Sequence, residues 1–136
     1  MMHYIKEYSL SDVRLCDKLI DLFKVAKKLG LTSPGLTGKY EVNKKVKDSE
    51  DLSVERLPKN NPLIPHPNDS GYFAAVRQFV DLIPKYYTDT QAAWRQPVEF
   101  KAPPHFQYYK PGGGYHAWHT DAMGDKIDRH LVFILY

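Results

Sequence analysis

The spacing of apolar residues changes along the chain, and this change limits the fold more than any other feature. In the N-terminal part they recur every three or four positions, at Val13, Cys16, Leu19, Ile20, Phe23 and Ala26. This period is that of one helix face. With Ser11 as the N-cap and Gly30 as the stop, it predicts a helix from about Asp12 to Leu29. The C-terminal run "HLVFILY" is β-branched and aromatic, which predicts a strand.

A second helix is expected in the middle of the chain. Asp69 or Ser70 is a suitable cap, and apolar residues from Phe73 to Ile83 keep the helical period. Pro84 should kink or break this helix because proline lacks a backbone donor, and "KYYTDTQAAWRQ" would continue it as a second piece. Helices thus precede strands, an order that predicts an α+β fold with its sheet near the C-terminal end.

Four further segments carry weaker signals. "HYIKEY", His3 to Tyr8, is typical of a short strand, and "TSPGLTGKY" is rich in turn-forming residues. The polar segment from Tyr40 to Val54 has room for an irregular strand or two. "VEFKAPPHFQYYK" is strand-like, although a proline pair interrupts it.

The chain is expected to form one domain over residues 1–136. The proline-rich stretch "RLPKNNPLIPHPNDSG" resembles a linker, but too little chain lies on either side of it for two good domains. The helical region would span about residues 9–95 and the β-core about residues 97–136.

Charge and composition exclude some partners. The net charge is only +3, and acidic residues directly follow the basic run from Lys39 to Lys47, so no nucleic-acid partner is predicted. No apolar run reaches membrane-spanning length, and "MMHYIKEYSLSD" lacks the apolar core of a signal peptide. The single cysteine, Cys16, allows no intrachain disulfide. Together these features predict a cytoplasmic protein without a membrane partner.

The segment "GGGYHAWHTD" holds the candidate metal ligands. Its three consecutive glycines, Gly112–Gly114, disfavour a helix. On extended backbone, His119 and Asp121 share one face while His116 takes the other. An imidazole and a carboxylate suit a divalent ion such as non-haem Fe(II). Two alternatives remain: a histidine hydrogen-bonded to a nearby aspartate, which is commoner on spacing alone, or a helical zinc site built from His116 and His119.

The wider pattern "QYYKPGGGYHAWHTD…RHLVFILY" resembles the iron-binding core of the prolyl-4-hydroxylase-like 2-oxoglutarate/Fe(II)-dependent dioxygenases. The matching features are Tyr109, the glycine turn Gly112–Gly114, Tyr115, His119, Asp121, Arg129 and the apolar strand that ends in Tyr136. "CDKLIDLF" resembles the family's leading helix. "SPGLTG" and "VKDSEDL" resemble its phage and marine bacterial members.

The resemblance implies a fold, a chemistry and a set of site residues. The fold would be a double-stranded β-helix, or jelly roll, with N-terminal helices packed on it. His119 and Asp121 would ligate Fe(II), and Tyr109 and Tyr136 would bind the cosubstrate 2-oxoglutarate. Tyr108 would bind the cosubstrate in place of Tyr109 if the strand register differs by one residue. The implied reaction is hydroxylation of a prolyl, other peptidyl or small-molecule C–H bond, with ascorbate as a further cofactor. Trp118 would pack on the face away from the metal.

The sequence departs from the family in one respect. A third ligand, a later histidine, and a basic residue that pairs with the far carboxylate of 2-oxoglutarate normally follow the segment that here ends at Tyr136. The remaining histidines do not suit that position: His3, His66, His105 and His130. We therefore expect a C-terminally truncated member that holds only the first part of the jelly roll. Its exposed edge at Leu131–Tyr136 would favour a homodimer. The alternative is a non-catalytic interaction module with a degenerate metal site.

Overall fold

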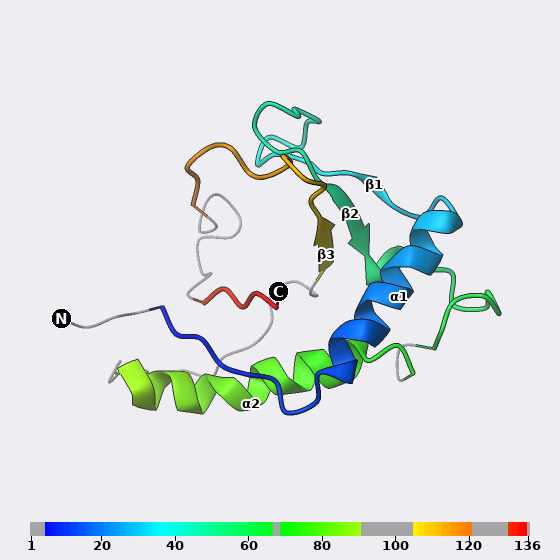
Figure 1. Ribbon diagram of the computed structural model, residues 1–136. Helices are drawn as coiled ribbons and strands as arrows, with labels where there is room; N and C mark the ends of the chain where they lie inside the picture. The colour runs from blue at the N-terminus through cyan, green and yellow to red at the C-terminus, as the bar shows by residue number, and fades with distance from the viewer. Residues whose placement is uncertain (1–4, 67–68, 91–104, 121–130, 136) are drawn as a thin grey trace. The chain divides into compact units, whose positions relative to one another are not determined.

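The computed structural model describes residues 5–66, 69–90, 105–120 and 131–135. The chain divides into two compact units, one of Met1–Val25 with Pro58–Phe100 and one of Ala26–Leu57 with Lys101–Tyr136. The described elements are α1 (Arg14–Lys28), β1 (Ser33–Pro34), β2 (Glu50–Ser53), a 3₁₀ turn (Val54–Arg56), α2 (Tyr72–Thr90) and β3 (His105–Tyr108), shown in Figure 1. The fold is α+β, as predicted, but β1 and β2 lie between the two helices, so the predicted order of helices before strands is wrong. None of the described helices is both long and apolar enough to cross a membrane.

Helix α1 lies close to its predicted bounds, but its cap and its buried face differ. The Asp12 carboxylate accepts a hydrogen bond from the Arg14 backbone N–H at 3.1 Å, so Asp12 rather than Ser11 caps the helix. The buried apolar residues of α1 are Leu15, Leu19, Leu22, Phe23 and Ala26. Val13 and Ile20, which the periodicity placed on this face, are exposed, and Cys16 is half-buried. The apolar face is therefore rotated toward Leu15 and Leu22.

The C-terminus of α1 confirms the role predicted for Gly30. Gly30 adopts a φ of +69°, in the left-handed region that glycine enters without strain. Its N–H donates to the Lys27 carbonyl at 3.0 Å, and the Leu31 N–H donates to the Ala26 carbonyl at 3.0 Å. This pair of bonds is a Schellman motif, which ends the helix and leads the chain into β1.

Helix α2 continues through Pro84, so the predicted break is wrong. Proline removes only the hydrogen bond to the Val80 carbonyl, and Val80 lies on an exposed part of the helix where water can replace it. The Thr88 hydroxyl donates to the Pro84 carbonyl at 3.0 Å and so satisfies another acceptor in this turn. At the N-terminus, buried Ser70 accepts a hydrogen bond from the Tyr72 N–H at 3.4 Å, consistent with one of the two predicted caps.

The predicted strand His3–Tyr8 is also wrong where it can be compared, because residues 5–8 form no strand. Tyr8 instead contacts the C-terminal part of α2. Its hydroxyl donates to the Asp89 carboxylate at 2.9 Å, and the Lys85 ammonium lies 5.1 Å from the centre of its ring. Side-chain contacts with a helix, rather than a strand partner, hold this segment.

The sheet belongs to the second unit and has the order β1-β2-β3, with both pairs antiparallel (Figure 1). Glu50 lies opposite Tyr108, and Leu52, which is fully buried, lies opposite Phe106. Strand β2 confirms the strand predicted between Tyr40 and Val54, and β3 confirms the strand character of "HFQY". Strand β1 was predicted as a turn. It is only two residues long, and its pairing with β2 depends on residues distant in sequence.

Two expectations for the C-terminal region are wrong. Residues 131–135 form no strand, although Leu131, Phe133 and Leu135 are more buried than Val132 and Ile134, as in an extended chain. A strand also requires a ladder of backbone hydrogen bonds, and the described sheet, β1-β2-β3, does not include this run. Trp118 is fully exposed and does not pack on a far face.

Candidate functional site

Two differently lined faces flank strand β2. Opposite residues of an antiparallel pair share a face, and neighbours along a strand alternate. Asp48, Glu50, Tyr108 and Lys110 therefore face one side. Lys47, Ser49, Asp51, Gln107 and Tyr109 face the other, which we call the Tyr109 face. Contacts confirm the alternation beyond the strand ends: the Lys47 ammonium lies 2.7 Å from Asp51, and that of Lys110 lies 3.2 Å from Asp48.

The glycine turn is fixed against the segment that leads into β2. The Asp48 N–H donates to the Gly114 carbonyl at 2.9 Å, and the His116 N–H donates to the Val46 carbonyl at 2.7 Å. A Cβ on Gly113 would lie 2.7 Å from the Asp48 carbonyl oxygen, too close for any other residue. The turn therefore needs glycine for close backbone approach, and it is not helical, as predicted.

His119 stacks on Tyr115, with ring centres 3.9 Å apart and planes 16° from parallel. Its Nδ1 lies 3.2 Å from the Ala117 carbonyl oxygen. Because a carbonyl oxygen only accepts, this contact is a hydrogen bond when Nδ1 carries the proton, and in that neutral tautomer the lone pair lies on Nε2. Tyr115 is also close enough to Tyr109 to interact with it electrostatically. Tyr115 also pairs with Lys47 in an antiparallel bridge, so its side chain lies on the same face as Lys47.

A buried polar cluster lies on the Tyr109 face. The Lys47 side chain is 5% exposed, and its ammonium is paired with the Asp51 carboxylate. The Ser49 hydroxyl donates to the same carboxylate at 2.7 Å. A Cβ on Gly35 would overlap the Ser49 hydroxyl and lie 3.0 Å from Lys47 Cε, so the backbone at Gly35 packs directly on the cluster. A buried ammonium is tolerated because a carboxylate compensates it.

The phenol of Tyr109 belongs to the same environment. Burial raises its pKa most, the negative charge of Asp51 raises it further, and a hydrogen bond with Ser49 opposes both. Tyr109 is therefore a neutral hydrogen-bond donor at physiological pH. Its hydroxyl donates to Gln107 Oε1 at 3.1 Å.

Comparison with protein-family models, curated proteins and solved structures finds no match for this chain.

Of the four predicted site residues, the structure describes Tyr109 and His119, which lie in the same unit, whereas Asp121 and Tyr136 fall outside the described residues. Within the described part of the chain, no three His, Cys, Asp or Glu side chains are grouped as metal ligands. Residues 116–120 form neither a helix nor a strand, so the helical zinc site of His116 and His119 is wrong and the extended segment expected there belongs to no strand.

The sequence analysis missed the cluster of Lys47, Ser49 and Asp51. The three residues occupy alternate positions in a polar segment, which is the available signal for a shared face of extended chain. Their burial depends on the packing of Gly35, which is distant from them in sequence.

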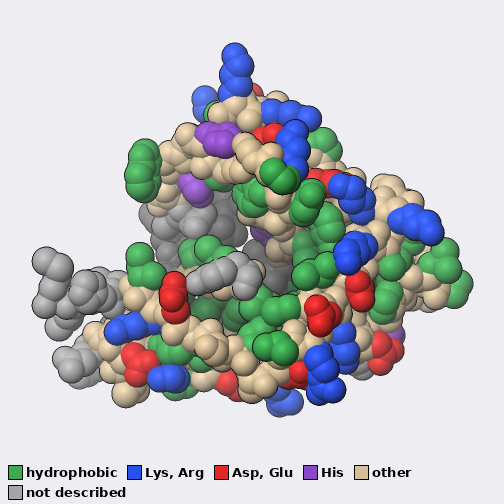
Figure 2. Space-filling model, viewed as in Figure 1, with side chains coloured by type: hydrophobic (Ala, Val, Ile, Leu, Met, Phe, Trp, Pro, Cys, Tyr) green, Lys and Arg blue, Asp and Glu red, His purple; other side chains and the backbone are tan. Residues whose placement is uncertain are grey.

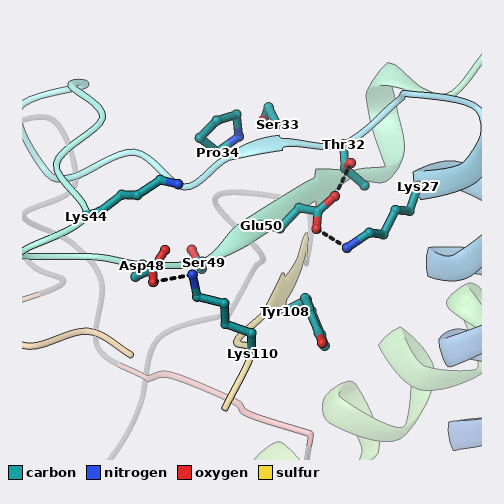
Figure 3. A pocket seen from close by; sticks show the side chains of 10 residues that line it. All are labelled: Lys27, Thr32, Ser33, Pro34, Lys44, Asp48, Ser49, Glu50, Tyr108 and Lys110. Carbon is teal, nitrogen blue, oxygen red and sulfur yellow. Dashed lines mark hydrogen bonds and ion pairs between the residues drawn. The ribbon is translucent and has the colours of Figure 1, made fainter. Parts of the chain in front are cut away.

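The opposite face of the sheet carries a cavity of about 430 Å³, shown in Figure 3. Glu50 forms an ion pair with Lys27 and accepts a hydrogen bond from the Thr32 hydroxyl at 2.6 Å. These contacts, that of Lys27 first, lower the pKa of the Glu50 carboxyl. The Lys27 ammonium also lies 5.0 Å from the centre of the Tyr108 ring.

Outside the cavity, basic and acidic side chains are interspersed over the face drawn in Figure 2.

Proposed function

We propose that this chain provides the metal- and cosubstrate-binding part of an Fe(II)- and 2-oxoglutarate-dependent dioxygenase of the prolyl-4-hydroxylase-like type. Its substrate would carry a prolyl, other peptidyl or small-molecule C–H bond. The observation that carries the proposal is that His119, which the sequence pattern assigns to iron, stacks on Tyr115, and that Tyr115 pairs with Lys47 on the face of Tyr109, the residue assigned to the cosubstrate. The three strands would be the first part of a jelly roll.

The proposed donors, the imidazole of His119 and the carboxylate of Asp121, suit Fe(II). The contact of His119 Nδ1 with Ala117 fixes the tautomer whose Nε2 lone pair a metal requires. Asp121 would add a carboxylate oxygen, and an imidazole with a carboxylate is a donor pair that Fe(II) accepts. With 2-oxoglutarate, bound iron would supply the oxidation of a C–H bond by dioxygen, with succinate and carbon dioxide as coproducts.

The chain's own residues have separate roles in this proposal. Tyr109 would donate a hydrogen bond to a carboxylate of 2-oxoglutarate, because its raised pKa keeps the proton on the phenol. Tyr136 would provide a second such donor. Ser49 and Asp51 would position the Tyr109 ring, and the glycine turn would hold His119 relative to β2.

Metal binding tests the proposal directly. Ni(II), or Fe(II) without oxygen, is titrated into the full chain by calorimetry. His119→Ala should lose binding, whereas His116→Ala, which changes an exposed histidine of the same segment, should keep it. Equal binding by the parent chain and His119→Ala would refute the proposed metal site.

Cosubstrate binding is a second test. With Ni(II) present, Tyr109→Phe should weaken 2-oxoglutarate binding by about fivefold, the usual effect of one lost hydrogen bond. Tyr108→Phe is the control, because Tyr108 faces the other side of the sheet. A larger effect from Tyr108→Phe than from Tyr109→Phe would assign the cosubstrate to a different site.

An interaction module is the second candidate function, and the exposure of Trp118, Val132 and Ile134 favours it. In this proposal the segment 131–136 would contact a second copy of the chain. Light scattering of the purified chain should then show a dimer that Val132→Lys with Ile134→Lys converts to a monomer. A parent chain that is monomeric at high concentration would rule out this homodimer.

A further inference from the structure

We infer that the cavity beside Glu50 and Lys110 binds a small organic monocarboxylate, with the Lys44 ammonium as the anchor for its acid group. The site lies on the face of the sheet opposite Tyr109. It is independent of the proposed dioxygenase, because neither iron nor 2-oxoglutarate is part of it.

The cavity has the dimensions of a ligand site. Its volume of about 430 Å³ falls in the range of roughly 300–1,000 Å³ that small-molecule pockets occupy. Four parts of the second unit line it: the end of α1, strand β1 with Thr32, the turn at Lys44, and the paired strands β2 and β3 with their extensions. The ligand would therefore be held by elements that hydrogen bonds and ion pairs already connect.

Among the residues that the structure describes, the charges of the lining leave the Lys44 ammonium without an ion-pair partner. Lys27 is paired with Glu50, and Lys110 is paired with Asp48. Lys44 forms no ion pair with any residue that the structure describes, and Figure 3 shows its side chain extending along the cavity toward Pro34. One negative charge on a ligand would compensate this ammonium.

The same lining disfavours a second negative charge. The carboxylates of Asp48 and Glu50 both line the cavity and would repel a dianion. Glu50 is a fixed part of the wall, because Lys27 and Thr32 bind both of its oxygens and its lowered pKa keeps it ionised. A monoanion is therefore favoured over phosphate or a dicarboxylate.

The organic part of the ligand has an apolar wall to contact. Pro34 and the Tyr108 ring line the cavity together, and Tyr108 is 44% exposed. An aromatic ring offers a face on which a flat apolar group stacks. Benzoate combines one carboxylate with a flat apolar ring, and it is the probe of choice.

The test is a titration of the ¹⁵N-labelled full chain, followed by NMR at constant ionic strength and without metal. Benzoate should shift the amide signals of Ser33, Glu50 and Lys110. Lys44→Gln should weaken benzoate binding by about fivefold, as expected for one solvent-accessible ion pair. Lys45→Gln removes the same charge from the adjacent exposed residue, which does not line the cavity, and should leave binding unchanged.

Two further comparisons make the inference falsifiable. Tyr108→Thr should weaken benzoate more than acetate, because only benzoate has a ring to stack. Phosphate and 2-oxoglutarate should bind more weakly than benzoate. Equal benzoate affinity of Lys44→Gln and the parent chain would overturn the inference, as would tighter binding of either dianion at the same residues. Neither result depends on His119, so the dioxygenase proposal stands or fails separately.

Discussion

The Lys47 ammonium lies 2.7 Å from the Asp51 carboxylate, and the lysine side chain is 5% exposed while that of Asp51 is 18% exposed. The two partners are therefore unequal: the cation is buried almost completely, and the anion keeps some contact with water. Removing the anion leaves a charge that water cannot reach, whereas removing the cation leaves a carboxylate that water partly solvates.

We expect Asp51→Asn to lower the free energy of unfolding by about 3 kcal/mol, and Lys47→Met to lower it by less. Urea unfolding followed by circular dichroism measures both. Asp21→Asn is the control, because the pair of Asp21 with Lys24 is exposed on both sides and should contribute less than about 0.5 kcal/mol. A greater loss for Lys47→Met than for Asp51→Asn would contradict this asymmetry.

Gly35→Ala should destabilise the chain by about 1–3 kcal/mol, because the added methyl group overlaps the Ser49 hydroxyl. Ser49→Ala removes that hydroxyl. The double variant should therefore lose less stability than the sum of the two single variants, a coupling that a double-mutant cycle measures. Strictly additive effects would show that Gly35 is required for another reason.

The pKa of Tyr109 should respond to its two neighbours in opposite directions. Asp51→Asn should lower it by removing a negative charge, and Ser49→Ala should raise it further by removing a hydrogen bond to the phenolate. Titration of ¹³Cζ-labelled tyrosine by NMR reports the shift, with the tyrosines assigned by single Phe variants. Changes of the same sign in both variants would disprove the proposed contacts.

Alkaline pH should destabilise the fold through Tyr109. Its folded pKa lies above the unfolded value of 10.0, so the native state holds this proton more tightly. The contribution of this proton to the free energy of unfolding is fully present below pH 10 and is lost as the pH rises through the folded pKa. Tyr109→Phe should therefore lose less stability than the parent chain when unfolding is compared at pH 8 and above pH 10.

Acid should act in the opposite direction through Glu50. Its folded pKa lies below the unfolded value of 4.5, because Lys27 and Thr32 bind the ionised form. The stabilisation is present above pH 4.5 and is lost as the pH falls through the folded pKa. Unfolding curves at pH 6 and pH 3 should differ less for Glu50→Gln than for the parent chain. Glu41→Gln, at an exposed residue outside the cavity, should match the parent.

The helices could be predicted because their signals are local. The apolar spacing of α1 and the glycine at position 30 lie within one segment, and the structure agrees with both. The errors concern interactions that periodicity does not report. Pro84 is tolerated because Val80 is exposed, and the face of α1 is rotated because Leu15 packs close to Gly71.

The sheet and the site could be predicted only in part, because both depend on pairing between distant segments. Nothing in "TSPGLTGKY" indicates that Ser33 pairs with Asp51. Conversely, the strong strand propensity of residues 131–135 does not place them in the described sheet, because propensity does not select a pairing partner. The motif made Tyr109 a candidate site residue, but its neighbours Ser49 and Asp51 follow from the register of β2 and β3.

The one-residue alternation around β2 makes the region unusually sensitive to length. A deletion of a single amino acid between Lys47 and Glu50 would move each following side chain of β2 to the opposite surface relative to Lys47. Lys47 would lose its counterion Asp51, and the cavity would lose the Glu50 carboxylate, in the same change. A substitution affects only one surface at a time. Insertions and deletions should therefore be tolerated far less well in this short stretch than in the neighbouring loops.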